Sequence, residues 1–292
     1  MTVKSLVRGV TPPFIWNLTR RVWGRNTNGN EQTTPKEGLS HFEWVAPESE
    51  STPTAYDAAN LVEAAAGRFP ELLKTIGGPE PFGCLPGEHQ GETTLFWQQQ
   101  AYPFAYALAL SLPSRAPLKI LDWGGGLGIY EHLARILYPQ VEFEYHIHEL
   151  PEFARRGPDF TPRARFHSQA SDWEADRFDL VMASGALQYA QDWRQALRQL
   201  LNVSGRWLYL ARIPTLLQES AARRIRHRHF FYGHEANVVF HVLPQRELIE
   251  RAEQEGLMLV REMIGAEEIL VQPDQIRIPF RGFLFQRVRE NP

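Results

Sequence analysis

Apolar and polar residues follow two alternating patterns from about residue 118 to the end of the chain. Short apolar runs predict strands at about 118–122, 142–148, 165–168, 178–183, 206–212, 258–263 and 281–286. Between most of these runs the apolar residues have helical spacing. Strands that alternate with helices predict a doubly wound α/β sheet with helices on both faces. The pattern by itself leaves the order and direction of the strands open.

Before residue 116 the pattern is mainly helical. The spacing predicts a helix over 55–76, broken near Pro70, and a second helix over 93–112, kinked at Pro103. Residues 25–54 are rich in polar residues, glycine and proline, which predicts a loop or linker. We therefore divide the chain into an N-terminal helical cap, residues 1–115, and a sheet domain, residues 116–292.

Two further segments stand out. Residues 213–244 are too long for an ordinary connection, so we interpret them as an insertion that covers the site. Residues 1–25 hold five basic residues and no acidic ones, among apolar residues. One interpretation is a basic amphipathic anchor on an anionic membrane surface. The favoured one is a pair of short helices packed on the domain or on a second copy in a homodimer, because scattered basic residues usually mark a solvated face.

Composition narrows the class of protein. The chain has 292 residues, 43% of them hydrophobic, and a formal charge of -3, which argues for a folded protein and gives no reason to expect a nucleic-acid partner. Cys84 is the single cysteine, so an internal disulfide is excluded and a reducing compartment is expected. The sequence has neither a signal peptide nor an apolar run of the ~20 residues needed to cross a bilayer. These features predict a cytoplasmic protein.

The strongest functional signal is L-K-I-L-D-W-G-G-G-L-G-I-Y, residues 118–130, which predicts a buried strand, a glycine loop and the start of a helix. The glycines have the spacing G-x-G-x-G. A dinucleotide fingerprint would need a glycine where Ile129 stands. Asp122, at the end of the strand, would repel a pyrophosphate but suits a cationic ligand. S-adenosylmethionine has an ammonium and a sulfonium group and no phosphate.

The segment I-L-D-W-G-G-G-L-G resembles motif I of the class I S-adenosylmethionine-dependent methyltransferases. More narrowly, W-G-G-G-L-G, S-G-A-L-Q-Y and R-G-F-L-F-Q resemble a little-characterised family of methyltransferases found among bacterial surface-polysaccharide genes. The resemblance covers about residues 118–288. It implies a Rossmann-like seven-stranded sheet that ends in an antiparallel hairpin, and S-adenosylmethionine as cofactor. It also implies transfer of the methyl group to a small polar acceptor, with sugar or sugar-nucleotide oxygens first.

The resemblance also assigns cofactor residues. Glu149, at the end of the second strand, would accept the ribose hydroxyls, and Asp172 would accept the adenine amino group. Trp173 would offer a flat face to the base, although a turn aspartate beside a core tryptophan is the alternative. Ser184 would lie beside the methionine part, and Tyr102 near the cofactor, unless its helix face is simply core. The predicted cofactor-binding set is Asp122, Gly124, Gly125, Gly126, Gly128, Glu149, Asp172, Trp173, Ser184 and Tyr102.

For the acceptor, His241 is the first candidate for the residue that removes a proton, followed by Tyr189 and His229. His241 lies in the apolar segment V-V-F-H-V-L-P, which would keep its imidazole neutral; a core histidine held by a backbone carbonyl is the alternative. Arg212 is expected to point towards the same crevice. The basic run over 223–229 would attract an anionic acceptor, although a solvated basic helix face is the default interpretation.

The sequence also contains features of a metal site and of two other classes of protein. His146, His148 and Glu152 have the spacing H-x-H-x-x-x-E of a metal site, but Pro151 intervenes and no partner histidine lies on a second hairpin, so we predict no metal. A NAD(P)-dependent oxidoreductase would use the same strand and glycine loop. A non-catalytic partner protein that retains the fold is the third alternative. Binding assays with S-adenosylhomocysteine and NADH would separate a methyltransferase from an oxidoreductase.

Overall fold

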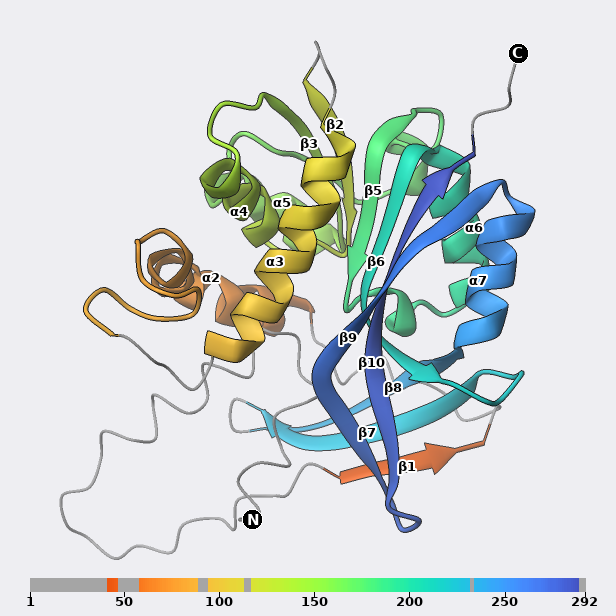
Figure 1. Cartoon of the computed structure of the whole chain (residues 1–292). Coiled ribbons are helices and arrows are strands. Elements are labelled where there is room, and N and C mark those ends of the chain that lie inside the picture. The colour runs from red at the N-terminus through yellow and green to blue at the C-terminus, as the bar shows by residue number, and fades with distance from the viewer. Residues whose placement is uncertain (1–40, 47–57, 89–93, 113–116, 232–233, 289–292) are drawn as a thin grey trace, which may run out of the picture.

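The computed structural model describes residues 41–46, 58–88, 94–112, 117–231 and 234–288 (Figure 1). The basic segment 1–25, with its predicted membrane or subunit contact, lies outside the described residues. In the part of the chain that is described, no helix is long and apolar enough to cross a membrane.

The seven strands expected from the apolar runs are all present and form one sheet. β2 pairs in parallel with β3 and β5, β4 pairs in parallel with β3, and β6 pairs in parallel with β5. β10 is antiparallel to both β6 and β9. The predicted α/β class and the antiparallel hairpin are therefore confirmed. The strands are β2 Leu118–Trp123, β3 Phe143–His148, β4 Arg165–His167, β5 Phe178–Ser184, β6 Ser204–Leu216, β9 Leu257–Gln272 and β10 Ile276–Arg287.

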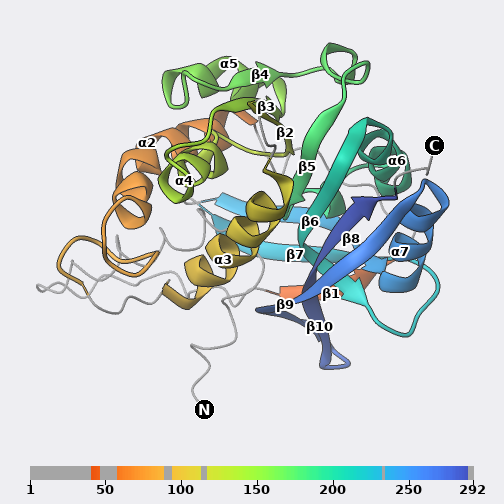
Figure 2. The ribbon, with the colours of Figure 1, turned by 45° about the horizontal axis from the view of Figure 1, so that its top comes forward.

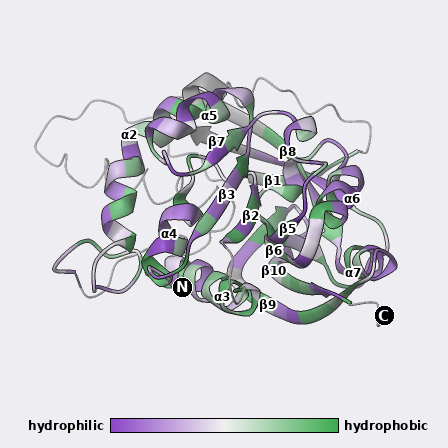
Figure 3. Ribbon diagram, turned by 90° about the horizontal axis from the view of Figure 1, so that it is seen from above, coloured by the Kyte–Doolittle hydropathy of each residue, from purple (hydrophilic) through white to green (hydrophobic). Residues whose placement is uncertain are grey.

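Helices cover both faces of this sheet (Figures 1 and 2). One face packs in an apolar cluster with α3 Thr94–Ser111 and α4 Ile129–Leu137, and the other with α6 Trp193–Val203 and α7 Gln245–Gln254. α2 Ala58–Ile76 packs against α4 and α5 Pro151–Arg156. In Figure 3 the ribbons of α4, α6 and α7 change between hydrophobic and hydrophilic along their length, as expected of helices that bury one side. α2 and α3 continue through Pro70 and Pro103, so the predicted break near Pro70 is wrong.

Two predictions for the remaining segments are also wrong. Within the predicted linker, β1 His41–Val45 is a strand that pairs with β7 and with the end of β9. The basic run forms a strand rather than a helix face: β7 Arg223–Phe231 pairs antiparallel with β8 His234–Pro244. Side chains alternate across these strands, so Phe42 and Ile225 enter an apolar cluster with Phe280 of β10 while the intervening arginines face outward.

β1, β7 and β8 lie across the end of the sheet at which β2, β5 and β6 finish (Figure 1). The long second halves of β9 and β10 reach down to this group and complete its apolar cluster. The segment predicted as an insertion, residues 213–244, therefore contributes the end of β6 and all of β7 and β8 to a cover over the carboxyl ends of the parallel strands.

Candidate active site

The glycine loop between β2 and α4 is shaped for close approach. Gly124, Gly126 and Gly128 all have positive φ, at 79°, 61° and 94°. A Cβ on Gly124 would lie 2.3 Å from the Cβ of Ala186, and one on Gly128 would lie 2.6 Å from Thr161 Oγ1. A Cβ on Gly126 would meet nothing within 4 Å. Two glycines are therefore required by packing, and Gly126 faces the open space that a ligand would enter.

Asp122 is the second-last residue of β2 and lies against this loop. Its side chain is 1% exposed, and its Oδ2 accepts a hydrogen bond from the Tyr145 hydroxyl at 3.2 Å. A Cβ on Gly125 would lie 2.6 Å from the same oxygen. Burial raises the pKa of Asp122 to about 7, opposed by the Tyr145 hydrogen bond and reinforced by the charge of Glu149. Because an ionised carboxylate is costly here, a cationic ligand group would offset that cost.

Glu149 joins the end of β3 to the glycine loop. Its Oε1 accepts the Gly126 amide hydrogen at 3.1 Å, and its Oε2 accepts that of Leu150 at 2.7 Å. Burial raises the pKa of this carboxyl, while the two backbone hydrogen bonds lower it. The structure thus brings together the predicted cofactor residues of the first two strands.

Ser184, at the end of β5, belongs to a chain of hydroxyl and amide groups. Its Oγ lies 2.9 Å from the Tyr130 hydroxyl of α4, which in turn donates to Gln100 Oε1 of α3 at 3.3 Å. Sequence reasoning named Tyr102 in this helix and missed Gln100. Tyr102 is 57% exposed and packs against Phe82, so it is not a core residue, and its contact with the cofactor stays a prediction. Residues two positions apart in a helix point to nearly opposite sides. Because Gln100 faces the sheet, Tyr102 faces away from it.

The two residues predicted to contact adenine, Asp172 and Trp173, differ in exposure. Trp173 is 1% exposed and lies in the apolar cluster that includes Leu121 and Phe178, so it offers no ring face to a base, and that prediction is wrong. The connection between β4 and β5 contains only the short helix η4 Ala170–Asp172, and Trp173 fills the space beneath it. Asp172 is exposed and accepts a hydrogen bond from the Gln169 amide at 3.4 Å. Its contact with adenine stays a prediction.

Beyond Ser184, a buried ion pair joins β6 to β9. Arg212 Nε and Nη2 each donate to a carboxylate oxygen of Glu267 at 2.7 Å, and both residues are 7% exposed. Arg212 has a positive φ of 55°, uncommon for a side chain of this size. A Cβ on Gly185 would lie 2.6 Å from its Nη1, so the guanidinium lies directly against the end of β5. Arg212 was predicted at this place; its partner on β9 was not.

Two residues of the short helix η5 Leu187–Tyr189 border this ion pair. Gln188 is 3% exposed; its Nε2 donates to the Arg212 carbonyl at 3.4 Å, and its Oε1 has no hydrogen-bond partner among the described residues. The Tyr189 ring packs on Phe240 of β8 at 5.5 Å. Burial raises the pKa of Tyr189 to about 12, opposed by the charge of Arg212. Near pH 7 the Tyr189 hydroxyl therefore keeps its hydrogen.

The two histidines predicted as candidate bases lie on different strands, His229 on β7 and His241 on β8. His241 follows Phe240 on β8 and so faces the other side of the strand from the Tyr189 ring. Burial and the charge of Arg224 lower its pKa, and a hydrogen bond to the backbone of Gln191 raises it. This arrangement fits the alternative of a structural histidine. His229 pairs with Ala236 in the β7–β8 register, and its side chain is outside the described residues.

Of the three residues with metal-site spacing, His146 and Glu152 have polar partners, whereas the His148 ring packs against the rings of Trp123 and Trp173. His146 Nδ1 lies 2.9 Å from His167 Nε2, and its Nε2 lies 3.1 Å from Glu144 Oε1. Glu152 accepts hydrogen bonds from Arg155 on the exposed face of α5. Among the described residues, no group of three side chains could hold a metal ion.

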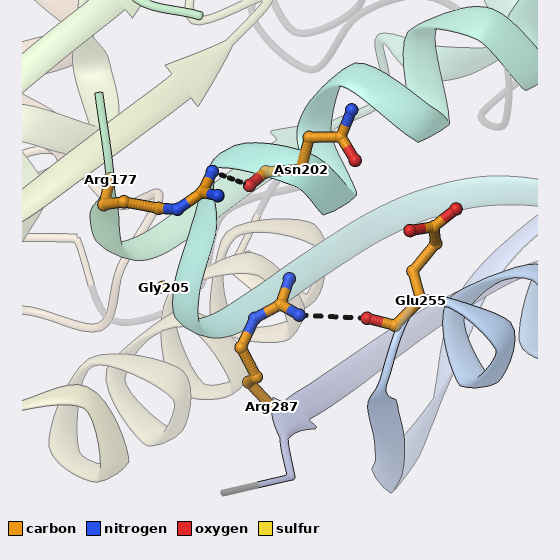
Figure 4. A pocket seen from close by; sticks show the side chains of 5 residues that line it. All are labelled: Arg177, Asn202, Gly205, Glu255 and Arg287. Atoms are coloured by element: carbon orange, nitrogen blue, oxygen red, sulfur yellow. Dashed lines mark hydrogen bonds between the residues drawn. The ribbon is translucent and has the colours of Figure 1, made fainter. Parts of the chain in front are cut away.

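An open hollow of about 490 Å³ lies at the opposite end of the sheet (Figure 4). Arg177 donates to the carbonyl of Asn202, and Arg287 donates to the carbonyls of Glu255, Ser204 and Leu201 at 2.7 to 2.9 Å. These groups cap the carboxyl ends of α6 and α7, where cations are favourable. The hollow is therefore explained by helix capping, and it lies away from the glycine loop.

Residues 96–262 match a family described as a methyltransferase domain, which is more than half of the chain. The chain belongs to this family. Membership confirms the predicted enzyme class and, with it, the predicted methyl donor S-adenosylmethionine. It also sets aside the NAD(P)-dependent oxidoreductase.

Solved structures similar to this methyltransferase share little sequence with it. One is the 1,6-didemethyltoxoflavin-N1-methyltransferase of Burkholderia thailandensis with bound S-adenosylhomocysteine, at 15% identity, 88% of this chain, 99% of that chain and a TM-score of 0.48. Another is the magnesium protoporphyrin IX methyltransferase of Synechocystis with bound S-adenosylmethionine. It is 11% identical, the match covers 80% of this chain and 98% of that chain, and the TM-score is 0.47. A third is an amino pentose methyltransferase of Micromonospora echinaspora. It is 15% identical, the match covers 66% of this chain and 92% of that chain, and the TM-score is 0.43. No curated protein matches the sequence.

Proposed function

We propose that this methyltransferase transfers a methyl group from S-adenosylmethionine to an oxygen of a small, neutral, polar acceptor, with sugars first. The observation that carries the proposal is the buried Arg212–Glu267 pair beside the end of β5. Its net charge is zero, so the acceptor half of the crevice presents hydrogen-bonding groups without an excess of charge. Preference for oxygen and for sugars comes from the narrower family resemblance.

The residues on the cofactor side fit this methyl donor. S-adenosylmethionine, when bound, supplies a methyl group activated by its sulfonium. The buried Asp122 carboxyl offers a counter-charge to a cation, and the open side of Gly126 offers space. Glu149 presents carboxylate oxygens at the end of β3 for ribose hydroxyls. The work of the protein would be to hold donor and acceptor in line under the β1–β7–β8 cover, because orientation accounts for much of the rate of such displacements.

An anionic acceptor, which the basic run had favoured, has less support. Arg226 of β7 donates to Glu43 of β1 at 3.0 Å, and the Arg223 guanidinium lies over the Trp44 ring at 3.5 Å. With Arg212 paired to Glu267, these arginines already have partners within the chain. Neutral sugars and glycosides therefore come before sugar nucleotides and carboxylates.

The test is methyl transfer from radiolabelled S-adenosylmethionine to matched acceptors. Neutral sugars and glycosides are expected to accept label, and their uronic acid and nucleotide-linked counterparts to accept at least about tenfold less, the equivalent of about 1.4 kcal/mol. Thin-layer separation of the products measures the transfer. A preference for the charged acceptors would contradict the proposal.

Glu149→Ala is expected to weaken S-adenosylhomocysteine binding by about 1 to 3 kcal/mol, because ribose hydroxyls lose a charged hydrogen-bond acceptor. Isothermal titration calorimetry measures the dissociation constant. Glu152→Ala removes a nearby glutamate that is paired on the exposed face of α5 and should leave the constant unchanged. Equal constants for wild type and a folded Glu149→Ala would show that the ribose is held elsewhere.

A further inference from the structure

Three side chains from distant parts of the sequence form one hydrogen-bonded chain that ends at the carboxyl end of β5. Gln100 of α3 and Tyr130 of α4 are 5% and 7% exposed, and Ser184 ends β5. Tyr130 donates to Gln100 Oε1 at 3.3 Å and lies 2.9 Å from Ser184 Oγ. The aromatic ring of Tyr130 is placed separately, by Phe104 at 4.9 Å between ring centres. Packing therefore holds the ring, and Gln100 contacts only its hydroxyl end.

The direction of the hydrogen bonds in this chain follows from the number of hydrogens. A tyrosine hydroxyl has one hydrogen, and a carboxamide oxygen can only accept. Because the Tyr130 hydrogen is directed to Gln100, the contact between Tyr130 and Ser184 requires the serine to donate. Burial raises the pKa of Tyr130 to about 12, so the tyrosine keeps its hydrogen near neutral pH. The lone pairs of Ser184 Oγ are then left for the crevice.

We propose that Gln100 is a positioning residue that turns the Ser184 hydroxyl oxygen, rather than its hydrogen, towards the cationic end of the cofactor. The proposal rests on the proposed function, in which S-adenosylmethionine is the ligand and its methionine part lies beside Ser184. S-adenosylmethionine has a sulfonium that S-adenosylhomocysteine lacks. An oxygen held towards this group favours the methyl donor over the demethylated product.

Gln100→Leu tests this assignment. In the variant the Tyr130 hydrogen turns to Ser184, whose own hydrogen is displaced towards the crevice and its cation. We expect S-adenosylmethionine affinity to fall about tenfold and S-adenosylhomocysteine affinity to fall less than about threefold, as for loss of one hydrogen bond to a charged group. Calorimetric titration with each compound measures the ratio of the two dissociation constants. Gln98→Leu, the same substitution at a half-buried glutamine of the same helix, should leave the ratio unchanged.

Two further variants separate positioning from simple packing. Gln100→Glu keeps an acceptor for the Tyr130 hydrogen and adds negative charge, so the preference for S-adenosylmethionine should not fall. Tyr130→Phe removes the link, so adding Gln100→Leu to it should change the ratio no further; this pair also serves if Gln100→Leu alone does not fold. Equal loss of both ligands, or no loss, in a folded Gln100→Leu overturns the proposal. A wild-type protein that binds neither compound overturns the proposed cofactor itself, which is a different result.

Discussion

Asp122→Asn is expected to make the unliganded protein more stable at pH 8 while removing most of its affinity for S-adenosylmethionine. Asp122 is 1% exposed, and burial raises its pKa from 3.8 to about 7. A shift of about 3 units corresponds to about 4 kcal/mol of unfavourable free energy once the group is ionised. Asparagine has the same shape, still offers an oxygen to the Tyr145 hydroxyl and cannot ionise.

The sign of the pH dependence follows from the raised pKa. The folded state holds the Asp122 proton up to about pH 7, whereas the unfolded state releases it near pH 4. The free energy of unfolding contributed by this group is therefore intact below pH 4 and falls as pH rises towards 7. Urea unfolding of both proteins at pH 4, 6 and 8 measures it. The difference between them should be near zero at pH 4 and largest at pH 8.

Cofactor binding should change in the opposite direction. The ionised carboxylate is the proposed counter-charge for a cationic ligand, so its removal is expected to weaken S-adenosylmethionine binding at least tenfold. An Asp122→Asn protein that binds S-adenosylmethionine as tightly as wild type would show that this carboxylate does not meet the charge of the cofactor.

Glu267→Leu is expected to lower the free energy of unfolding by about 3 to 5 kcal/mol, because it leaves the Arg212 guanidinium buried without its two hydrogen bonds to a carboxylate. Denaturant unfolding measures the loss. The double variant Arg212→Met/Glu267→Leu removes both charges and should recover most of the stability.

The neighbouring residue supplies the matched control. Glu268 pairs with Arg277 at 2.7 Å, and both side chains are about half exposed or more. Glu268→Leu should therefore change stability by less than about 1 kcal/mol. A Glu267→Leu protein that resembles this control would mean that Arg212 does not depend on Glu267 in the folded state.

The sequence pattern predicts the central sheet well because those strands are short, apolar and buried by helices on both faces. It predicts the lower halves of β6, β9 and β10 poorly. In β9 the run is interrupted by Glu267 and Glu268, which reads as the end of a strand. Glu267 continues the strand because Arg212, 55 residues away in the sequence, neutralises it. Such a pairing between distant elements has no local signal.

In the candidate site, too, local sequence predicts some residues, whereas others depend on packing between distant elements. The glycine loop, Asp122 and Glu149 are consecutive features of strand ends, so spacing alone finds them. Gln100 and Tyr102 lie two residues apart, and only the phase of α3 against α4 decides which one turns inward to Tyr130. Trp173 is buried because no long helix lies between β4 and β5. A side chain has to fill that space, and local residue type does not reveal the need.

The pairing of β1 with β7 has a consequence for the order in which the molecule assembles. Glu43 and Arg226, which join these strands, are 183 residues apart. During synthesis β1 leaves the ribosome early and has no partner until most of the chain has been made. Contacts of such long range also carry a large closure entropy and slow folding. The β1 edge of the cover should therefore be completed late in folding, after the β7–β8 hairpin and the sheet that carries the glycine loop.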